Sequence, residues 1–375
     1  MGKPVVVVGW QVGGRTGWGL FGLHLGLQMA RLGYPVALGS EPDIGSIPVG
    51  LRHVVRGWFG TGPEAGEGAP VVVSALNAAF EGPPEVNVDK AGVAARHVGI
   101  AVFEDTGTYD DAARGRLAAY AKVVVPSAWC GARLLDGAVE FVPTVVHQGY
   151  DGALWRPRER RRSDGRFVVF AGGKLEFRKG QDIVVEAFRR FRRTPEGKDA
   201  LLVTQWHNAW PQTMDGVWAK GWVEGVPEFG QPDGLTEWLA LNGIPKDAHT
   251  DLGFVGQAES AAIIAECDVA VFASRGEGAT NMALAECMAL GVPCIASWNT
   301  GHKDLPKNAL LALEHQPPVE TPCRLYAGMA GWGESDPEEM VEQLKAVRNG
   351  TAPETVPLQR AWRDVAGDWE RVLCS

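Results

Sequence analysis

The chain has 375 residues, which at about 150 residues per domain predicts two domains. Hydrophobic residues make up 45% of the sequence and charged residues 22%, a mixture typical of a globular protein rather than a fibrous or low-complexity one. The net charge of −9 disfavours general affinity for nucleic acid or for an anionic membrane. No apolar run approaches the roughly 18 residues of a membrane span, and the short apolar segment near the N-terminus predicts a first strand rather than a signal peptide.

The six cysteines lie far apart, without the close pairs typical of a zinc site or a disulfide framework. They are Cys130, Cys267, Cys287, Cys294, Cys323 and Cys374. The sequence therefore predicts a reduced, cytoplasmic protein with no zinc or other metal.

In chain order, the first third alternates strand-like runs with helical patterns. Pro4–Gly9 predicts a buried strand, and Leu20–Leu32 has helical spacing that Gly33 ends. A second helix is expected over Ala112–Tyr120. Further short strands are predicted at Tyr34–Leu38, Val71–Ser74, Val98–Phe103, Val123–Val125 and Val142–Val146.

The alternation is interrupted by an arginine-rich linker at 151–165 and then begins again. Strands are predicted at Phe167–Phe170, Leu201–Thr204, Thr250–Val255, Val269–Ala273 and Cys294–Ser297, with helices at Gln181–Phe191 and Thr280–Leu290. Trp206–Gly234 predicts a long excursion outside the sheet, and Pro357–Leu373 a closing amphipathic helix. We therefore predict an α/β protein with two doubly wound, Rossmann-like domains, 1–150 and 166–355, followed by a C-terminal helical piece at 356–375.

Eleven arginines lie between Arg156 and Arg193. A solvated linker followed by the polar face of a helix would explain them. A peripheral contact surface for an anionic acceptor or a membrane is the alternative, and both interpretations stay open.

Three loops follow predicted strands at the edge where open parallel sheets bind ligands. The first, Gly9–Gly19, contains Gly13 and Gly14 and lets the backbone approach a ligand closely. It lacks the Gly-Lys-Ser/Thr of a P-loop and the acidic residue of a dinucleotide-binding motif. A flexible loop that binds no ligand is therefore the alternative interpretation.

The second loop, Gly172–Gly180, places Lys174 and Lys179 five residues apart before a helix. Two fixed ammonium groups there would hold a diphosphate and stabilise the charge that develops when a nucleotide departs. A solvated basic turn is the alternative.

The third loop follows Val269–Ala273 and carries Glu277, with Glu286 nine residues later in an otherwise apolar helix. A carboxylate on a largely buried helix needs polar partners. Sugar or ribose hydroxyls would serve, and so would a structural ion pair.

At these residues the sequence resembles the retaining GT-B glycosyltransferases of family 4. Gly173-Lys174-x4-Lys179-Gly180 has the spacing of the family's Gly-Arg-x4-Lys-Gly loop. The family's Glu-x7-Glu motif corresponds to Glu277 and Glu286, here separated by eight residues. The resemblance implies two domains that face each other across a cleft, with the last helix crossing back to the N-terminal domain.

The resemblance also implies roles for individual residues. Gly173, Lys174 and Lys179 would hold the donor diphosphate. Glu277 would meet the donor sugar and Glu286 the ribose. Backbone amides of Gly278, Ala279, Thr280 and Asn281 would face the donor, and Gly13 and Gly14 would approach it from the other domain. His97 would lie near the reacting sugar carbon, with Glu104 as the competing residue and a structural histidine as the alternative.

The implied activity is metal-independent transfer of a sugar from a UDP- or GDP-sugar donor, with retained configuration and no cofactor. The acceptor stays open among a saccharide, a lipid-linked sugar, a natural product and a modified polymer. Trp206–Trp210 would form an acceptor wall or internal packing. A nucleotide-sugar epimerase and a non-catalytic nucleotide-sugar binding protein are the alternative functions.

Overall fold

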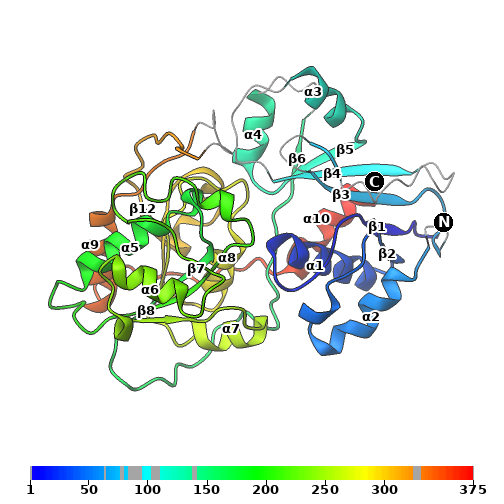
Figure 1. Cartoon of the computed structure of the whole chain (residues 1–375). Coiled ribbons are helices and arrows are strands. Elements are labelled where there is room, and N and C mark those ends of the chain that lie inside the picture. The colour runs from blue at the N-terminus through cyan, green and yellow to red at the C-terminus, as the bar shows by residue number, and fades with distance from the viewer. Residues whose placement is uncertain are drawn as a thin grey trace. The chain divides into compact units, whose positions relative to one another are not determined.

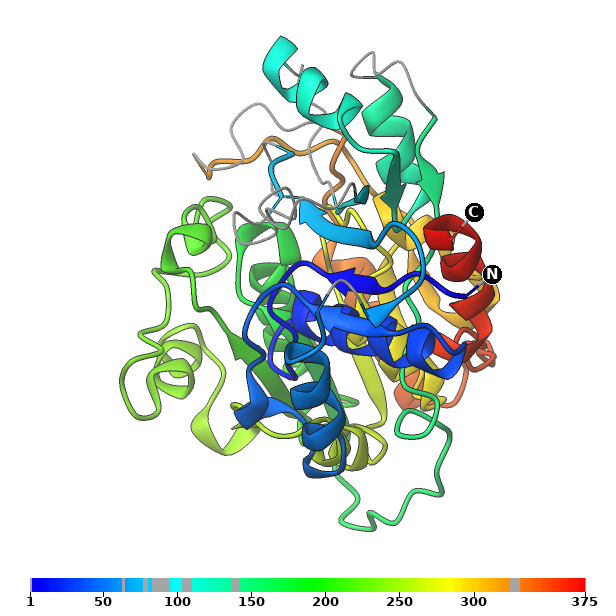
Figure 2. The same ribbon diagram turned by 90° about the vertical axis from the view of Figure 1, so that its right-hand side faces the viewer.

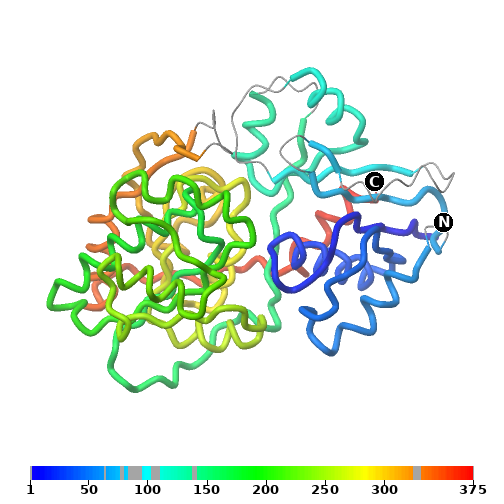
Figure 3. The backbone as a smooth tube through the Cα atoms, viewed as in Figure 1, coloured from blue at the N-terminus to red at the C-terminus, as the bar shows by residue number. Residues whose placement is uncertain are grey.

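The computed structural model describes residues 2–62, 65–76, 80–82, 95–102, 110–136, 142–323 and 331–374. The chain divides into two units, each with its own parallel sheet. The first unit contains the described residues up to 102 together with 110–152 and 360–374, and the second contains those of 153–359. Both ends of the chain therefore belong to the first unit, as the blue and red ends of the tube in Figure 3 show.

In the first unit the described residues form a six-stranded sheet in the order β2-β1-β3-β4-β5-β6, with every pair parallel. The strands are β1 (Val6–Val8), β2 (Val36–Leu38), β3 (Val71–Leu76), β4 (Arg96–Ala101), β5 (Lys122–Val125) and β6 (Thr144–Val145). The helices α1 (Gly17–Arg31), α2 (Val49–Phe59), α3 (Asp111–Ala118) and α4 (Ala128–Asp136) connect them. Continuous valine runs form the central strands because both faces of a parallel sheet are covered.

The C-terminal helix α10 (Trp362–Cys374) packs on α1 in the same unit (Figure 1). Its buried apolar residues recur at helical spacing, and Trp362 and Trp369 place their rings 5.4 and 5.3 Å from the ring of Phe21. Lys3 and Glu370 form an ion pair at 3.6 Å, and the two chain ends lie near each other in Figure 2. The C-terminal helix therefore completes the first unit.

In the second unit the described residues form another six-stranded parallel sheet, in the order β12-β11-β10-β7-β8-β9. The strands are β7 (Val168–Lys174), β8 (Leu201–His207), β9 (His249–Asp251), β10 (Val269–Phe272), β11 (Cys294–Ser297) and β12 (Leu311–Leu313). The helices are α5 (Gln181–Phe191), α6 (Gly234–Leu241), α7 (Gln257–Ile264), α8 (Met282–Ala289) and α9 (Pro337–Arg348). The prediction of an α/β protein with two doubly wound sheets is confirmed.

The order of the strands fixes where each sheet can bind a ligand. The chain runs outward from β7 to β8 and β9, then returns to place β10 on the other side of β7. The first sheet has the same reversal, between β1 and β3. Loops diverge at such a reversal, so the carboxyl ends of β7 and β10 are where a ligand site is expected.

Some predicted elements differ from the structure. The strand predicted at Val142–Val146 shortens to β6, and Val142 is 83% exposed. The excursion predicted at Trp206–Gly234 begins two residues too early, because Trp206 and His207 are the last residues of β8 and pair with β7. The closing helix begins at Trp362 rather than Pro357.

Candidate active site

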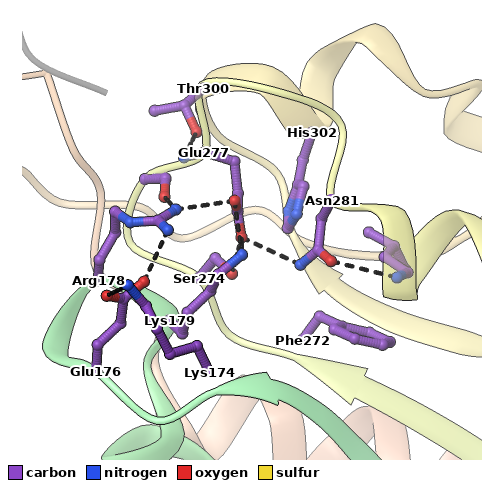
Figure 4. A network of polar contacts seen from close by, with 12 residues as sticks. Lys174, Glu176, Arg178, Lys179, Phe272, Ser274, Glu277, Asn281, Thr300 and His302 are labelled. Atoms are coloured by element: carbon purple, nitrogen blue, oxygen red, sulfur yellow. Dashed lines mark hydrogen bonds and ion pairs between the residues drawn. The ribbon is translucent and has the colours of Figure 1, made fainter. Parts of the chain in front are cut away.

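The charged residues of the candidate site come from the carboxyl ends of β7 and β10, and the segment after β11 adds Thr300 and His302 (Figure 4). Lys174 ends β7, and the short turn η4 (Phe177–Lys179) follows. Gly180 is the N-cap residue that precedes α5, with φ of 69°, and a Cβ atom there would lie 2.1 Å from the carbonyl oxygen of Ala273. Glycine is required by both the backbone angle and this close approach, which brings η4 against the loop after β10.

Five charged side chains form a continuous network at this edge. Lys174 Nζ lies 2.7 Å from one oxygen of Glu176, and Arg178 Nη2 donates to the other oxygen at 2.7 Å. Arg178 Nη1 also donates to Glu277 Oε2 at 2.9 Å. Lys179 Nζ donates to both oxygens of Glu277, at 2.6 and 2.8 Å. The structure thus brings together Lys174, Lys179 and Glu277, which the sequence had placed in two separate loops.

Glu277 is 3% exposed and fully engaged by donors. Besides Lys179 and Arg178, the Ser274 hydroxyl donates to Oε1 at 2.7 Å and Asn281 Nδ2 donates to Oε1 at 3.1 Å. Burial alone would raise the pKa of Glu277, but the charges of Lys179 and Arg178 outweigh it and lower the pKa to about 2. Glu277 is therefore ionised at every physiological pH.

The pKa values of the neighbouring residues also reflect the opposing effects of burial and nearby charges. Burial opposes ionisation of Glu176, and the charges of Arg178 and Lys174 overcome it, so the pKa of Glu176 is also lowered. Burial lowers the pKa of Lys179, and the charge of Glu277 offsets part of that effect. With three cations and two carboxylates, the network has an excess of one positive charge.

The backbone that supports Glu277 has two residues in the left-handed region. Asn281 has φ of 59° and Thr300 has φ of 37°. The side chain of Asn281 caps α8 by accepting from the Leu284 amide, and Thr300 Oγ1 accepts from the Glu277 amide at 2.8 Å. Such conformations cost about 1–3 kcal/mol each and concentrate at functional sites, where the surrounding structure holds them.

His302 lies beside Glu277 and is fully buried (Figure 4). Its Nδ1 lies 3.0 Å from the Ser297 carbonyl oxygen, so this nitrogen carries the proton in the neutral ring. Burial lowers the pKa of His302 although Glu277 opposes the shift. Its Nε2 has no hydrogen-bond partner among the residues that the structure describes.

The segment after β8 contributes one aromatic residue to this edge. Trp210 is 49% exposed, and its ring centre lies 5.4 Å from Lys174 Nζ, within the range of a cation–π contact. Trp206 is 1% exposed. Of these two tryptophans, Trp206 therefore belongs to the core, and Trp210 has the exposure that a substrate contact requires.

Glu286 and the loop before α8 are also placed by the structure. Glu286 is 9% exposed on α8, the helix that Asn281 caps. Gly278, Ala279 and Thr280 connect Glu277 to this helix and are buried. The donor contacts expected of these residues stay predictions.

The predicted site residues of the first unit have other surroundings. The Gly14 amide donates to Ser46 Oγ at 2.8 Å, and a Cβ atom on Gly14 would lie 2.3 Å from the Ser46 carbonyl oxygen. Glycine at this position is thus explained by packing within the first unit, and Gly13 is its neighbour in the same loop. His97 is the second residue of β4, at its amino end, while the competing Glu104 lies outside the described residues.

Sequence reasoning missed Glu176, Arg178, Ser274, Thr300 and His302. For Glu176 a signal was present, because Lys174 and Glu176 lie two residues apart with opposite charges, and such alternation places side chains on one side of an extended segment. Arg178 lies in the short turn η4 rather than in extended backbone, so the alternation did not predict its position.

Several arginines of the Arg156–Arg193 region have partners within the second unit. Arg160 and Arg162 each contact Asp268 at 2.6 Å, and Arg190 contacts Glu186 at 2.7 Å. These ion pairs favour the structural interpretation of the region over a contact surface. Among the described residues, no cluster of three or more His, Cys, Asp or Glu side chains could hold a metal ion, and no helix is both long and apolar enough to cross a membrane.

Comparison with known proteins supports an enzyme class. A family model described as "Glycosyl transferases group 1" matches residues 227–320, which include Glu277 and Glu286. No curated protein matches the sequence. Several solved structures resemble the chain over nearly its whole length.

Sucrose-phosphate synthase from Thermosynechococcus elongatus is 15% identical with a TM-score of 0.59, and the alignment covers 100% of this chain and 95% of that one. A glycosyltransferase from Rickettsia africae is 11% identical with a TM-score of 0.56, covering 99% of both chains. Anabaena HepE in complex with UDP-glucose is 14% identical with a TM-score of 0.53, covering 100% of this chain and 96% of HepE. The chain therefore has the GT-B fold of two Rossmann-like domains, and the family match supports a glycosyltransferase.

Proposed function

We propose that this protein transfers a sugar from a nucleoside diphosphate sugar to an acceptor hydroxyl, with retained anomeric configuration and without a metal ion. The observation that carries the proposal is the network of Lys174, Glu176, Arg178, Glu277 and Lys179 at the reversal point of the second sheet. Its excess positive charge suits a diphosphate, which is the leaving group of such a donor.

The two lysines retain donors for that leaving group. An ammonium group has three N–H donors, and two of those of Lys179 form hydrogen bonds with Glu277. In the proposed reaction, the bond between the anomeric carbon and the phosphate oxygen breaks, and its electron pair leaves with the nucleoside diphosphate. The acceptor oxygen forms the new bond on the same face, and its proton passes to the departing phosphate. Lys174 and Lys179 stabilise the negative charge that appears on the diphosphate.

Two comparisons support the donor class. HepE has been solved with UDP and with UDP-glucose, and its fold matches this chain over nearly its full length. The region matched by the glycosyltransferase family model contains Glu277 and Glu286, the residues proposed to contact the sugar and the ribose. On this basis we propose a UDP- or GDP-sugar as the donor.

The proposal is tested by thermal unfolding of the purified protein with UDP, GDP, ADP and their common sugar conjugates, each with and without EDTA. One nucleoside diphosphate should stabilise the protein, and EDTA should not change the shift. A shift that EDTA abolishes would contradict metal independence.

Incubation of the stabilising donor with a panel of acceptors then tests the reaction. Proton NMR of the product should show the anomeric configuration of the donor, and an inverted product would contradict retention. Isomerisation of the donor without any acceptor would instead identify an epimerase. Binding with neither reaction across the panel would favour a nucleotide-sugar binding protein.

A further inference from the structure

Arg178 occupies the centre of the charged network. It is 7% exposed, and it lies on η4, where its side chain links Glu176 with Glu277 (Figure 4). One terminal nitrogen, Nη2, donates to Glu176 at 2.7 Å. The other, Nη1, donates to Glu277 and to the Gly276 carbonyl oxygen, each at 2.9 Å.

Each carboxylate that Arg178 contacts also holds one lysine. Glu176 is fully buried and contacts Lys174 at 2.7 Å through the oxygen that Arg178 does not use. Glu277 contacts Lys179 through both oxygens. Arg178 therefore connects two lysine–carboxylate pairs. The Lys174–Glu176 pair lies at the end of β7, and the Lys179–Glu277 pair joins η4 to the loop after β10.

The guanidinium group is suited to this position by its shape. Its two terminal nitrogens are held in one plane by delocalisation, so the carboxylates that they contact are held at a fixed separation. A lysine at the same place would offer one nitrogen on a flexible stem and could not set that separation. Each carboxylate in turn orients one ammonium group. The separation that Arg178 imposes on the two carboxylates therefore also determines the separation of the two lysine ammonium groups.

We propose that Arg178 is a positioning residue that fixes the spacing of the Lys174 and Lys179 ammonium groups to match the two phosphates of a diphosphate. This inference rests on the proposed function of the same site. Arg178 itself has its terminal nitrogens turned toward the two carboxylates, so it acts through the lysines and does not touch the ligand.

Arg275 provides a matched control for an arginine with a purely structural role. It is fully buried beside the same turn and donates to both oxygens of Asp182, at 2.8 and 2.7 Å, and to Glu334 at 2.9 Å. It also donates to the Phe177 carbonyl oxygen at 2.7 Å. Neither of its carboxylate partners orients Lys174 or Lys179 in the contacts of the described residues.

The test uses inorganic pyrophosphate and orthophosphate, because these probes contain no base or sugar. Calorimetric titration compares the full-length wild type with R178K and R275K at a temperature where all three are folded. R178K should bind pyrophosphate about tenfold or more weakly, the size of one charge-assisted hydrogen bond, with a smaller loss for orthophosphate, which needs one ammonium group. R275K should unfold at a lower temperature while its preference for pyrophosphate stays that of the wild type.

A second variant keeps the inference falsifiable if R178K does not fold. E176Q/R178M removes one negative and one positive charge together, so the net charge of the network is unchanged. It should show the same loss of preference for pyrophosphate. In a K174M background, the R178K change should cost less pyrophosphate affinity than in the wild type, because one of the two positioned lysines is already absent.

The outcomes separate this inference from the function on which it rests. A folded R178K or E176Q/R178M protein with the wild-type preference for pyrophosphate would overturn the positioning role while leaving the diphosphate site in place. A wild-type protein that binds neither pyrophosphate nor any nucleoside diphosphate would overturn the proposed function, and the role of Arg178 with it.

Discussion

The Lys179–Glu277 ion pair allows stability and catalysis to be separated in one experiment. The change Lys179→Met keeps most of the side-chain volume and removes the ammonium group that donates to both oxygens of Glu277. The side chains of Lys179 and Glu277 are 16% and 4% exposed, so solvent screens the pair weakly. Breaking a buried pair costs about 3–5 kcal/mol, and because Arg178 still contacts Glu277 we expect the lower end, about 3 kcal/mol.

The loss of transfer activity is a separate quantity. If Lys179 stabilises the departing diphosphate, its removal should lower the turnover by about 10²–10³, as removal of one oxyanion donor does in other enzymes. A typical domain is stable by about 5–15 kcal/mol, so the variant should remain folded at the assay temperature.

Urea unfolding of the wild type, K179M, E277Q and K179M/E277Q measures the pair directly. The double variant should lose less stability than the two single variants together, because each single change already removes the Lys179–Glu277 ion pair. Additive stability changes would refute the ion pair. A folded K179M protein with near-normal turnover would refute the diphosphate assignment.

Three further outcomes follow from the site and from the first unit. E286A should weaken nucleotide binding in calorimetry, whereas unaltered affinity would identify Glu286 as part of a structural contact. Because Lys179 and Arg178 outweigh burial and lower the pKa of Glu277 from 4.5 to about 2, its ionised form adds about 3 kcal/mol of stability that is lost as the pH falls from about 4.5 to about 2. E277Q should remove this loss of stability between about pH 4.5 and about pH 2. The same pH dependence in E277Q and the wild type would contradict Glu277 as its source. In the first unit, burial lowers the pKa of His24 from 6.5 to about 4 against the charge of Asp151, so stability should fall as the pH drops from about 6.5 to about 4. H24F, which keeps a ring against Trp362, should remove this loss in thermal unfolding, and an unchanged pH dependence would exclude His24 as its source.

The sequence predicted the described strands other than β12, because most of these strands are apolar and buried. Val71–Val73 and Val269–Phe272 are apolar at every position, and such runs between helical patterns indicate parallel strands. Gln181–Phe191 has the same bounds in prediction and structure. Its strongly amphipathic pattern, which follows Gly180, explains that agreement.

Elements with weaker patterns were missed. The helix α7 (Gln257–Ile264) has no clear apolar face, and α9 (Pro337–Arg348) lies in a segment dominated by charged residues. Its Asp336 cap and the proline that opens it were nevertheless visible in the sequence. Short helices of this kind are decided by tertiary packing rather than by local pattern.

The charged network shows a different limit of sequence reasoning. Lys174, Lys179 and Glu277 were found because their loops follow strands, but Arg178 was only counted among the eleven arginines between Arg156 and Arg193. Its burial depends on Glu277, which lies 99 positions away and is brought beside it by the pairing of β7 with β10. No local pattern contains that pairing. The sequence alone therefore gave no reason to expect that replacing Lys179 would also cost stability.

The crowding around Glu277 constrains how a donor sugar can bind there. Its two oxygens accept five hydrogen bonds, from Lys179 twice and from Arg178, Ser274 and Asn281 once each. A carboxylate has about four lone-pair sites, so a sugar hydroxyl that bonds Glu277 must displace one of these donors. Lys179 keeps both of its bonds to Glu277 when its third N–H meets a diphosphate, and Arg178 is held by Glu176 as well. The donors that a sugar hydroxyl would displace are therefore those of Ser274 and Asn281, so S274A should leave diphosphate affinity unchanged while altering the binding of the donor sugar.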